Sequence, residues 1–175
     1  MALEIKHFAR NNQSGFTLME LMIVIGIIGI LSAIVLPEVF NPKHRVKKVA
    51  RELMGDMQSI KMAAVKNNES WRIIFGGGGY TIQDGNGNTK KTITFSNFAE
   101  GVAYGHGAAT TNATSGGGTF PVGDISYGGN TLTFNPRGTC SSGYVYLAFK
   151  DNVYSIGTLS TGAVKLRRWS AGEWR

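Results

Sequence analysis

The hydrophobic and polar positions of this chain follow three patterns in turn. Residues 16–36 form an apolar run in which Glu20 is the only charged residue. After Pro42, apolar residues recur at spacings of three and four, which predicts an amphipathic helix that ends near Asn67. From Trp71 onward, short alternating runs separated by glycine predict antiparallel strands. We expect the apolar stripe of the amphipathic helix to pack on a sheet, and it consists of Val46, Val49, Leu53, Met57, Ile60 and Ala64.

The glycine-rich segments between the apolar runs predict turns and one long loop. "WRIIF" and "YTIQ" flank "GGGG", and "KTITF" follows "DGNGNT", so we expect hairpins there. Residues 105–119, "GHGAATTNATSGGGT", are low in complexity and lack apolar anchors, which predicts a mobile loop. A later antiparallel series is predicted by "TLTFNPRG", "GYVYLAF", "VYSIGTL" and "AVKLRRW".

The N-terminal apolar run is long enough to enter a membrane. A spanning helix needs roughly 20 apolar residues, and membranes tolerate glycines such as Gly26 and Gly29, where helices approach closely. The segment before the run carries Lys6, His7 and Arg10. By the positive-inside rule this segment stays in the cytoplasm, which places the C-terminal part outside the inner membrane.

The run does not have the order of a secretory signal that is removed. Such a signal carries its small-residue cleavage site after the apolar region, whereas here Gly15 precedes the run and Pro37 ends it. Pro37 and Pro42 interrupt helical hydrogen bonding, which predicts a kink or short break near residues 37–43. A simple N-terminal anchor would explain the apolar run but not Glu20.

Glu20 needs an explanation because an ionised carboxylate costs several kcal/mol in hydrocarbon. Cleavage between Gly15 and Phe16 would create an α-amine four residues before Glu20. With an ordinary pKa of about 7.7–8, this amine is largely cationic at neutral pH. It could pair with the Glu20 of a neighbouring subunit shifted along the helix axis, so that assembly satisfies the charge. The alternative is an incidental, neutral carboxyl group.

These residues also carry a resemblance to a known family. "GFTLME", followed by an apolar stretch that ends at Pro37, resembles the class III signal of type IV pilins and type II secretion pseudopilins. The resemblance implies that a prepilin peptidase cleaves after Gly15 and methylates the amine of Phe16. It also implies that Glu20 acts in filament assembly. Met19 stands where isoleucine is more usual.

The C-terminal part is similar to the GspH/FimT group of minor pseudopilins. "LTFNPRG", a short turn, "YVYLAF" and a strand that ends in "STGAVKLRRW" carry this likeness. It implies an α+β, pilin-like fold, in which a long N-terminal helix, first transmembrane and then amphipathic, packs on antiparallel β-sheets. The predicted segments are a cytoplasmic leader peptide over 1–15, a transmembrane and assembly helix over 16–37, an amphipathic helix over 38–68, and a β-rich globular periplasmic part over 69–175.

The formal net charge of +7 brings anionic partners into consideration. We expect the basic residues at the start of the amphipathic helix to form a solvated face beside the anionic membrane surface. A dedicated nucleic-acid site is the alternative for the same residues. They are Lys43, His44, Arg45, Lys47, Lys48 and Arg51.

The C-terminal tail, "GAVKLRRWSAGEWR", is a second candidate for an anionic partner. Its basic residues can contact phosphates, and its aromatic rings can stack on the bases of a single strand. In the DNA-uptake members of the FimT group, a Gly-Arg-x-Arg motif in this region binds DNA. Here Gly162 matches that motif, but Ala163 and Lys165 stand at its two arginine positions.

Strand alternation also divides the basic residues of the tail. Lys165 and Arg167 would share one face of the strand, and Arg168 would lie on the other. The possible DNA-binding residues are Lys165, Arg167, Arg168 and Trp169. The alternative is a solvated edge strand whose charges discourage aggregation.

No motif for enzyme chemistry is present in the sequence, and a membrane-anchored enzyme is the least favoured class. The glycine clusters form neither GxxxxGK[ST] nor GxGxxG, so no phosphate cradle is indicated. His7, His44 and His106 lack the spacing of metal ligands, so we expect neither a metal nor a cofactor. Cys140 is the only cysteine, which excludes an intrachain disulfide, and we expect it to be structural or incidental.

The sequence therefore predicts a non-enzymatic minor pilin or pseudopilin of the bacterial inner membrane. Its precursor crosses the membrane once with the C-terminal part periplasmic, and the processed chain joins a type II secretion pseudopilus or a type IV pilus. Its expected partners are other pilin or pseudopilin subunits, a prepilin peptidase, an inner-membrane assembly platform and membrane lipid. The alternative is a FimT-like minor pilin that binds DNA for uptake.

Overall fold

The computed structural model describes the backbone of residues 15–39 and 42–175, and the side chains of residues 15–32 and 44–175. The predicted leader therefore lies outside the described residues except for Gly15, and the predicted break falls in part on residues 40–41, which also lie outside them. The chain divides into two compact units, Met1–Phe40 and Asn41–Arg175.

The first unit contains the helix α1, Leu18–Val39. Thr17 begins the helix, because its Oγ1 accepts a hydrogen bond of 3.1 Å from the backbone N–H of Glu20. No helix is both long and apolar enough to cross a membrane within the part of the chain that the structure describes. The predicted membrane segment, 16–37, continues past Ser32, where the described side chains of α1 stop.

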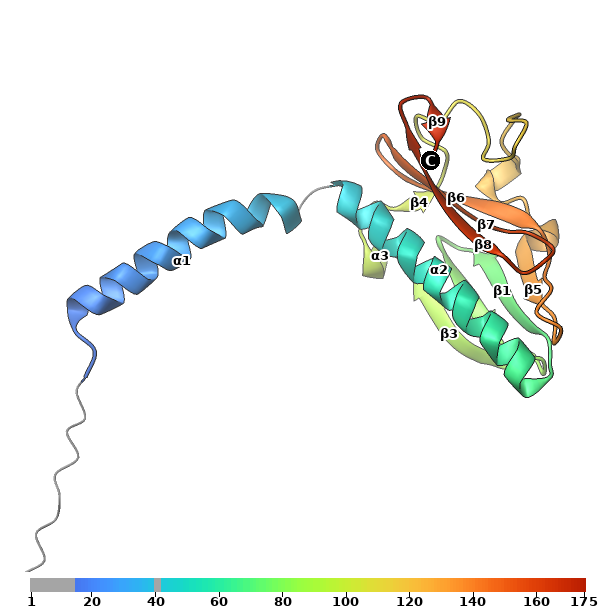
Figure 1. The fold of residues 1–175 in the computed structure, drawn as a ribbon, viewed down its shortest axis with the longest axis horizontal. Helices are drawn as coiled ribbons and strands as arrows, with labels where there is room; N and C mark the ends of the chain where they lie inside the picture. The colour runs from blue at the N-terminus through green and yellow to red at the C-terminus, as the bar shows by residue number, and fades with distance from the viewer. Residues whose placement is uncertain (1–14, 40–41) are drawn as a thin grey trace, which may run out of the picture. The chain divides into compact units, whose positions relative to one another are not determined.

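The second unit packs one helix, α2, on two antiparallel sheets (Figure 1). α2 spans Pro42–Asn67. The first sheet has the order β3-β2-β1-β5, with β1 Trp71–Gly76, β2 Gly79–Gln83, β3 Thr89–Thr94 and β5 Thr131–Phe134. The second has the order β4-β6-β7-β8-β9, with β4 Ala103–Tyr104, β6 Gly143–Phe149, β7 Asn152–Thr158, β8 Val164–Ser170 and β9 Glu173–Trp174. A short helix, α3, spans Phe95–Phe98, and 3-10 turns span Val122–Asp124 and Gly128–Asn130.

The predicted α+β fold class is confirmed, and so are the predicted hairpins. Gly77 and Gly78 turn β1 into β2 with φ of 59° and 71°, a left-handed conformation that glycine adopts without steric cost. β2 then pairs with β3. The predicted C-terminal series is divided between the sheets: β6, β7 and β8 pair in succession, whereas β5 pairs with β1. No pattern in the sequence predicted the short elements β4, β9 and α3.

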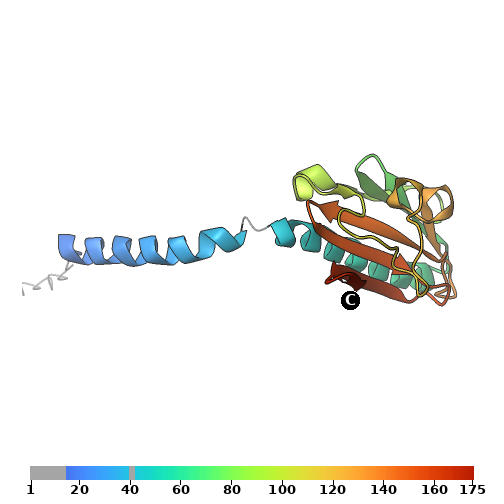
Figure 2. The ribbon, with the colours of Figure 1, turned by 90° about the horizontal axis from the view of Figure 1, so that it is seen from above.

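The predicted apolar stripe of α2 forms the centre of the core. All of its six residues are at most 3% exposed, and α2 contacts strands of both sheets, chiefly β7, β6, β8 and β1. Figure 2 shows α2 running along one side of the strands. The prediction that this helix packs on a sheet is therefore confirmed.

A polar cluster joins α2 to the first sheet. The ammonium of Lys91 on β3 lies 2.7 Å from Glu52 Oε1 and 2.8 Å from Asp56 Oδ1, and Tyr80 donates a hydrogen bond of 2.6 Å to Asp56 Oδ2. Burial opposes the charge of Lys91, but these carboxylates outweigh it and raise the pKa of the ammonium. Burial and the bond to Asp56 raise the pKa of the Tyr80 hydroxyl. The cluster is therefore an ion pair with a neutral phenol at neutral pH.

Replacing Leu53 with alanine is expected to lower the free energy of unfolding by about 2–5 kcal/mol, because the truncation leaves a cavity in a packed core. Leu53 is fully buried between α2 and the sheets. Met62→Ala is the matched control, since Met62 lies on the same helix but is 66% exposed. Chemical unfolding of both variants measures the difference. Equal losses for the two variants would contradict the orientation of α2.

Candidate functional site

The predicted processing site precedes the first turn of α1. Gly15 has open space around it, because a Cβ placed on it would meet no atom within 4 Å. Phe16 is 84% exposed. Nothing within the described residues therefore requires glycine at position 15 or buries the ring at position 16.

Glu20 occupies the first turn of α1 with its side chain exposed. Thr17 and Glu20 have the spacing of a capping box, in which the threonine hydroxyl binds the N–H of the glutamate and the carboxylate binds back to the threonine N–H. Only the threonine half is formed, at 3.1 Å. Within the described residues the Glu20 carboxylate has no hydrogen bond or ion pair. It is available to a cation from a second molecule.

The described part of α1 has no polar face. Its large apolar side chains are exposed on every side of the helix. A helix that is apolar all round is stable only when lipid or other helices surround it. These side chains are Leu18, Met19, Leu21, Met22, Ile23, Val24, Ile25, Ile27, Ile28, Ile30 and Leu31.

The possible DNA-binding residues lie on β8, and the structure separates them. The strand register places Lys165 opposite Gly157, Arg167 opposite Ser155 and Arg168 opposite Tyr154, which confirms the predicted alternation. Lys165 is exposed. Arg167 points the other way from Arg168 and donates a hydrogen bond of 2.8 Å to the carbonyl oxygen of Ala113. The Nε of Arg168 is buried and has no hydrogen-bond partner.

The two C-terminal tryptophans face each other and the loop before them. Trp169 and Trp174 pack edge to face with ring centroids 5.3 Å apart, and Trp174 lies 5.6 Å from the ring of Tyr146. The indole N–H of Trp174 donates to the carbonyl oxygen of Thr111 at 2.7 Å. Both rings are half-buried.

The loop over residues 105–119 is attached to the second sheet at several points. The backbone N–H of Ala113 donates to the Tyr146 hydroxyl at 2.9 Å, and Ala109 and Ala113 are buried. The ring of His106 stacks at 3.9 Å on Phe120, whose edge meets Tyr146. The prediction that this segment lacks apolar anchors is therefore wrong. Its anchors are small alanines and backbone groups, which a search for large apolar residues does not detect.

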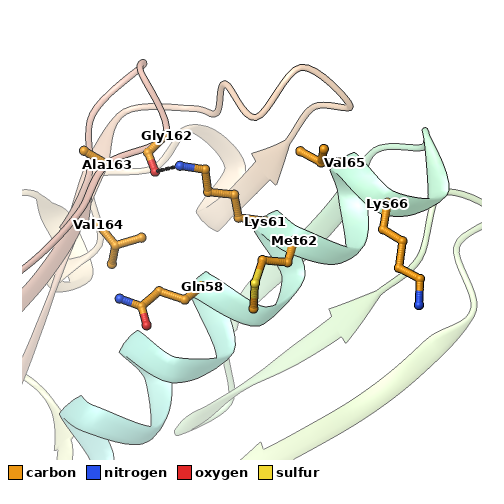
Figure 3. Close-up of a pocket in the computed structure, with 8 residues that line it drawn as sticks. All are labelled: Gln58, Lys61, Met62, Val65, Lys66, Gly162, Ala163 and Val164. Atoms are coloured by element: carbon orange, nitrogen blue, oxygen red, sulfur yellow. Dashed lines mark hydrogen bonds between the residues drawn. The ribbon is translucent and has the colours of Figure 1, made fainter.

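Gly162, the one match to the DNA-binding motif, has a structural explanation. It lies in the β7–β8 turn with φ of 80°, and a Cβ on it would lie 1.9 Å from the carbonyl oxygen of Gly138. Lys61 on α2 donates a hydrogen bond of 2.9 Å to the carbonyl oxygen of Gly162 (Figure 3). The close approach of two turns and a lysine therefore accounts for glycine at this position.

The same turn borders an open groove. The groove has a volume of about 700 Å³ and lies between the second half of α2 and the start of β8 (Figure 3). Its apolar lining includes Met62 and Val65, both more than half exposed. Lys66 lies at its edge. The groove holds no cluster of polar groups that would define a ligand.

Cys140 and the described histidines do not assemble a reactive site. Cys140 is buried, and its thiol lies 3.1 Å from the carbonyl oxygen of Leu159. Nδ1 of His106 lies 2.5 Å from Asp124. Among the described residues, no three His, Cys, Asp or Glu side chains gather where they could hold a metal ion.

Comparison with known proteins finds relatives at both ends of the chain. The prokaryotic N-terminal methylation motif matches residues 10–36. The type II secretion system core protein G of Pseudomonas aeruginosa is 43% identical over 54 residues, which are 31% of this chain and 37% of that protein. The type IV major fimbrial protein FimA of Dichelobacter nodosus is 37% identical over 75 residues, which are 42% of this chain and 48% of that protein. The chain therefore spans less than half the length of these relatives.

The remaining comparisons concern the folded part of the chain. A crystal structure of the type IV minor pilin FimU of Pseudomonas aeruginosa is similar with a TM-score of 0.48 and 14% identity, over 78% of this chain and 96% of FimU. The family described as type II transport protein GspH matches residues 49–166. The resemblances predicted from "GFTLME" and from the C-terminal strands are thereby confirmed. The chain belongs to the GspH family and carries the N-terminal methylation motif of type IV pilins and pseudopilins.

Proposed function

We propose that the chain is a minor pilin or pseudopilin that is processed at its N-terminus and assembles through α1. A prepilin peptidase cleaves after Gly15 and methylates the amine of Phe16. The precursor crosses the bacterial inner membrane once, with the β-rich part on the periplasmic side. An assembly platform in that membrane then transfers the processed chain into a type II secretion pseudopilus or a type IV pilus.

The observation that carries this proposal is the combination found at the start of α1. An all-round apolar helix begins two residues after Phe16, and the exposed carboxylate of Glu20 has no partner within the described residues. The methylation motif covers the same residues. A new amine at Phe16 of one subunit would neutralise Glu20 of a neighbour, and the apolar sides of the helices would cover each other. The proposed role is that of a structural subunit and not of an enzyme.

DNA binding by the tail stays a prediction, because nothing in the geometry favours it over the filament role. Of the basic residues on β8, only Lys165 has an exposed side chain, and Arg167 already binds the loop at Ala113. An open stacking platform would need free ring faces, whereas Trp169 packs on Trp174.

Site-specific photo-crosslinking in cells tests whether α1 is the assembly surface. A photoreactive side chain at Ile27, which is 53% exposed on α1, is expected to join the chain to other subunits that carry a methylation motif. The matched control places the same side chain at Lys90, on β3 at the outer edge of the first sheet. Mass spectrometry identifies the adducts. Adducts of Ile27 with lipid alone, in cells that assemble filaments, would contradict the proposal.

A further inference from the structure

The first half of α2 carries a basic stripe that the proposed function does not use. Four basic residues lie on one face of this helix, because they follow one another at spacings of three, one and three residues. They are His44, Lys47, Lys48 and Arg51. This face lies away from the apolar stripe that begins with Val46 and Val49. The basic residues, together with Phe98 of α3, line an open groove of about 520 Å³.

The stripe breaks a local rule of helix stability. Like charges three or four residues apart repel each other, as Lys47 and Lys48 do with Arg51. A sequence that departs from such a rule without compensation inside the fold points to a functional site. An anion bound between these three cations would relieve the repulsion.

The one carboxylate among the described residues that line the groove is already paired. Glu52 also lines the groove, but its carboxylate lies 2.7 Å from the ammonium of Lys91. Within the described residues, Lys47, Lys48 and Arg51 have no carboxylate partner. Lys48 holds its ammonium 4.4 Å from the ring centroid of Phe98, a contact that fixes its position without neutralising its charge.

The neighbouring cation is held apart from the groove. Arg45 donates a hydrogen bond of 3.0 Å to the carbonyl oxygen of Glu100, and its guanidinium lies 5.6 Å from the ring of Phe149. Arg45 therefore fastens the start of α2 to the rest of the unit. The contacts of Arg45 fix the position of the helix that carries the cations of the groove.

We propose that this groove binds the phosphate of an anionic phospholipid headgroup, with Lys47, Lys48 and Arg51 as its cations and Phe98 beside them. The inference rests on the proposed function, because it requires α1 to be in the membrane. Lys47 follows the last residue of α1, Val39, by eight positions in the sequence, and the length of this linker limits how far the groove can lie from the end of α1. Basic residues next to a membrane helix gain binding energy from anionic lipid.

Native mass spectrometry of the full chain in non-ionic detergent tests the proposal. Phosphatidylglycerol is expected to bind and phosphatidylcholine, which carries no net charge, to bind far less. The triple variant K47Q/K48Q/R51Q is expected to bind phosphatidylglycerol about a hundredfold more weakly, which is roughly fivefold for each cation removed. The control K66Q/R137Q/K165Q removes three exposed cations elsewhere on the second unit and is expected to bind like the unaltered chain.

Competition distinguishes the possible sources of the phosphate. Inorganic phosphate and a single-stranded oligonucleotide are added at equal phosphate concentration, and neither is expected to displace the lipid. Displacement by inorganic phosphate would replace the lipid with a free anion as the ligand, and displacement by the oligonucleotide would make the groove a nucleic-acid site. Equal binding of the two lipids, or equal binding by the two triple variants, would overturn the proposal as well.

The experiment also separates a binding role from a structural one. Lys47→Glu replaces the repulsion between Lys47 and Arg51 by an attraction between residues four apart, so the melting temperature is expected to stay unchanged or to rise while lipid binding falls. A lower melting temperature with unchanged lipid binding would assign the stripe to the fold. Because the measurement is made in detergent, its failure leaves cleavage after Gly15 and filament assembly untouched, and the failure of those steps does not alter its result.

Discussion

Glu20→Ala is expected to leave the chain inserted in the membrane but to remove it from filaments. In the proposed assembly, the carboxylate of one subunit neutralises the α-amine of Phe16 on another. Without it, that amine would have to enter an apolar helix bundle unpaired, at a cost of several kcal/mol. The loss does not come from the fold of the helix, because the first hydrogen bond of α1 uses the backbone N–H of Glu20 and not its side chain.

The measurement is the fraction of the chain in filaments sheared from cells, relative to the fraction in membranes. Glu20→Gln is expected to fail like Glu20→Ala, since it keeps the shape of the side chain and removes only the charge. Glu100→Ala is the matched control, because it removes an exposed carboxylate from the second unit. Normal incorporation of Glu20→Ala would show that the carboxylate is incidental.

Gly15→Val is expected to leave the chain as an uncleaved precursor. The peptidase must bring its catalytic groups to the bond between Gly15 and Phe16, and a branched side chain at that bond obstructs the approach. Gly15 has open space within the chain itself, so valine there does not disturb α1. Any loss of processing then reports on the peptidase and not on folding.

Gly26→Val is the matched control for this variant. Gly26 lies within α1, and a Cβ placed on it would also meet no atom within 4 Å, so the two substitutions have the same steric freedom in the isolated chain. The control is expected to be cleaved normally. The intact mass of the chain recovered from membranes distinguishes the precursor from the mature chain. Unchanged processing of Gly15→Val would exclude the proposed cleavage site.

The elements that the sequence predicted well are those set by local spacing. The apolar stripe of α2 could be predicted because the residues of a buried helix face recur every three to four positions. The hairpins β1–β2 and β2–β3 could be predicted because their turns contain glycines at positions that need positive φ. The apolar run over residues 16–36 predicted the helix that the structure shows as α1, Leu18–Val39.

The features that the sequence did not predict depend on contacts between distant residues. β5 reads like the strands that follow it, yet it pairs with β1, about 60 positions earlier in the chain. The loop around Ala113 is held by Tyr146 and Arg167 through backbone atoms, which leave no trace in the side-chain pattern. Arg167 could not be recognised as a loop contact, because its partner is a carbonyl group that every residue possesses.

The basic stripe of α2 stands between these two cases. The spacing of its basic residues is visible in the sequence. Whether their charges are neutralised depends on which residues the nearby carboxylates pair with. Glu52 lines the same groove as Arg51, but its carboxylate pairs with the ammonium of Lys91. Only the structure shows that the cations beside it keep their charge available.

The most direct test of the proposed role is the intact mass of the chain recovered from sheared surface filaments. We predict a single species that begins at Phe16 and is heavier by one methyl group on its α-amine. A chain that retains Met1 in the filament fraction would contradict processing after Gly15. Absence of the chain from filaments, with only mature chain in the membranes, would contradict its role as a subunit.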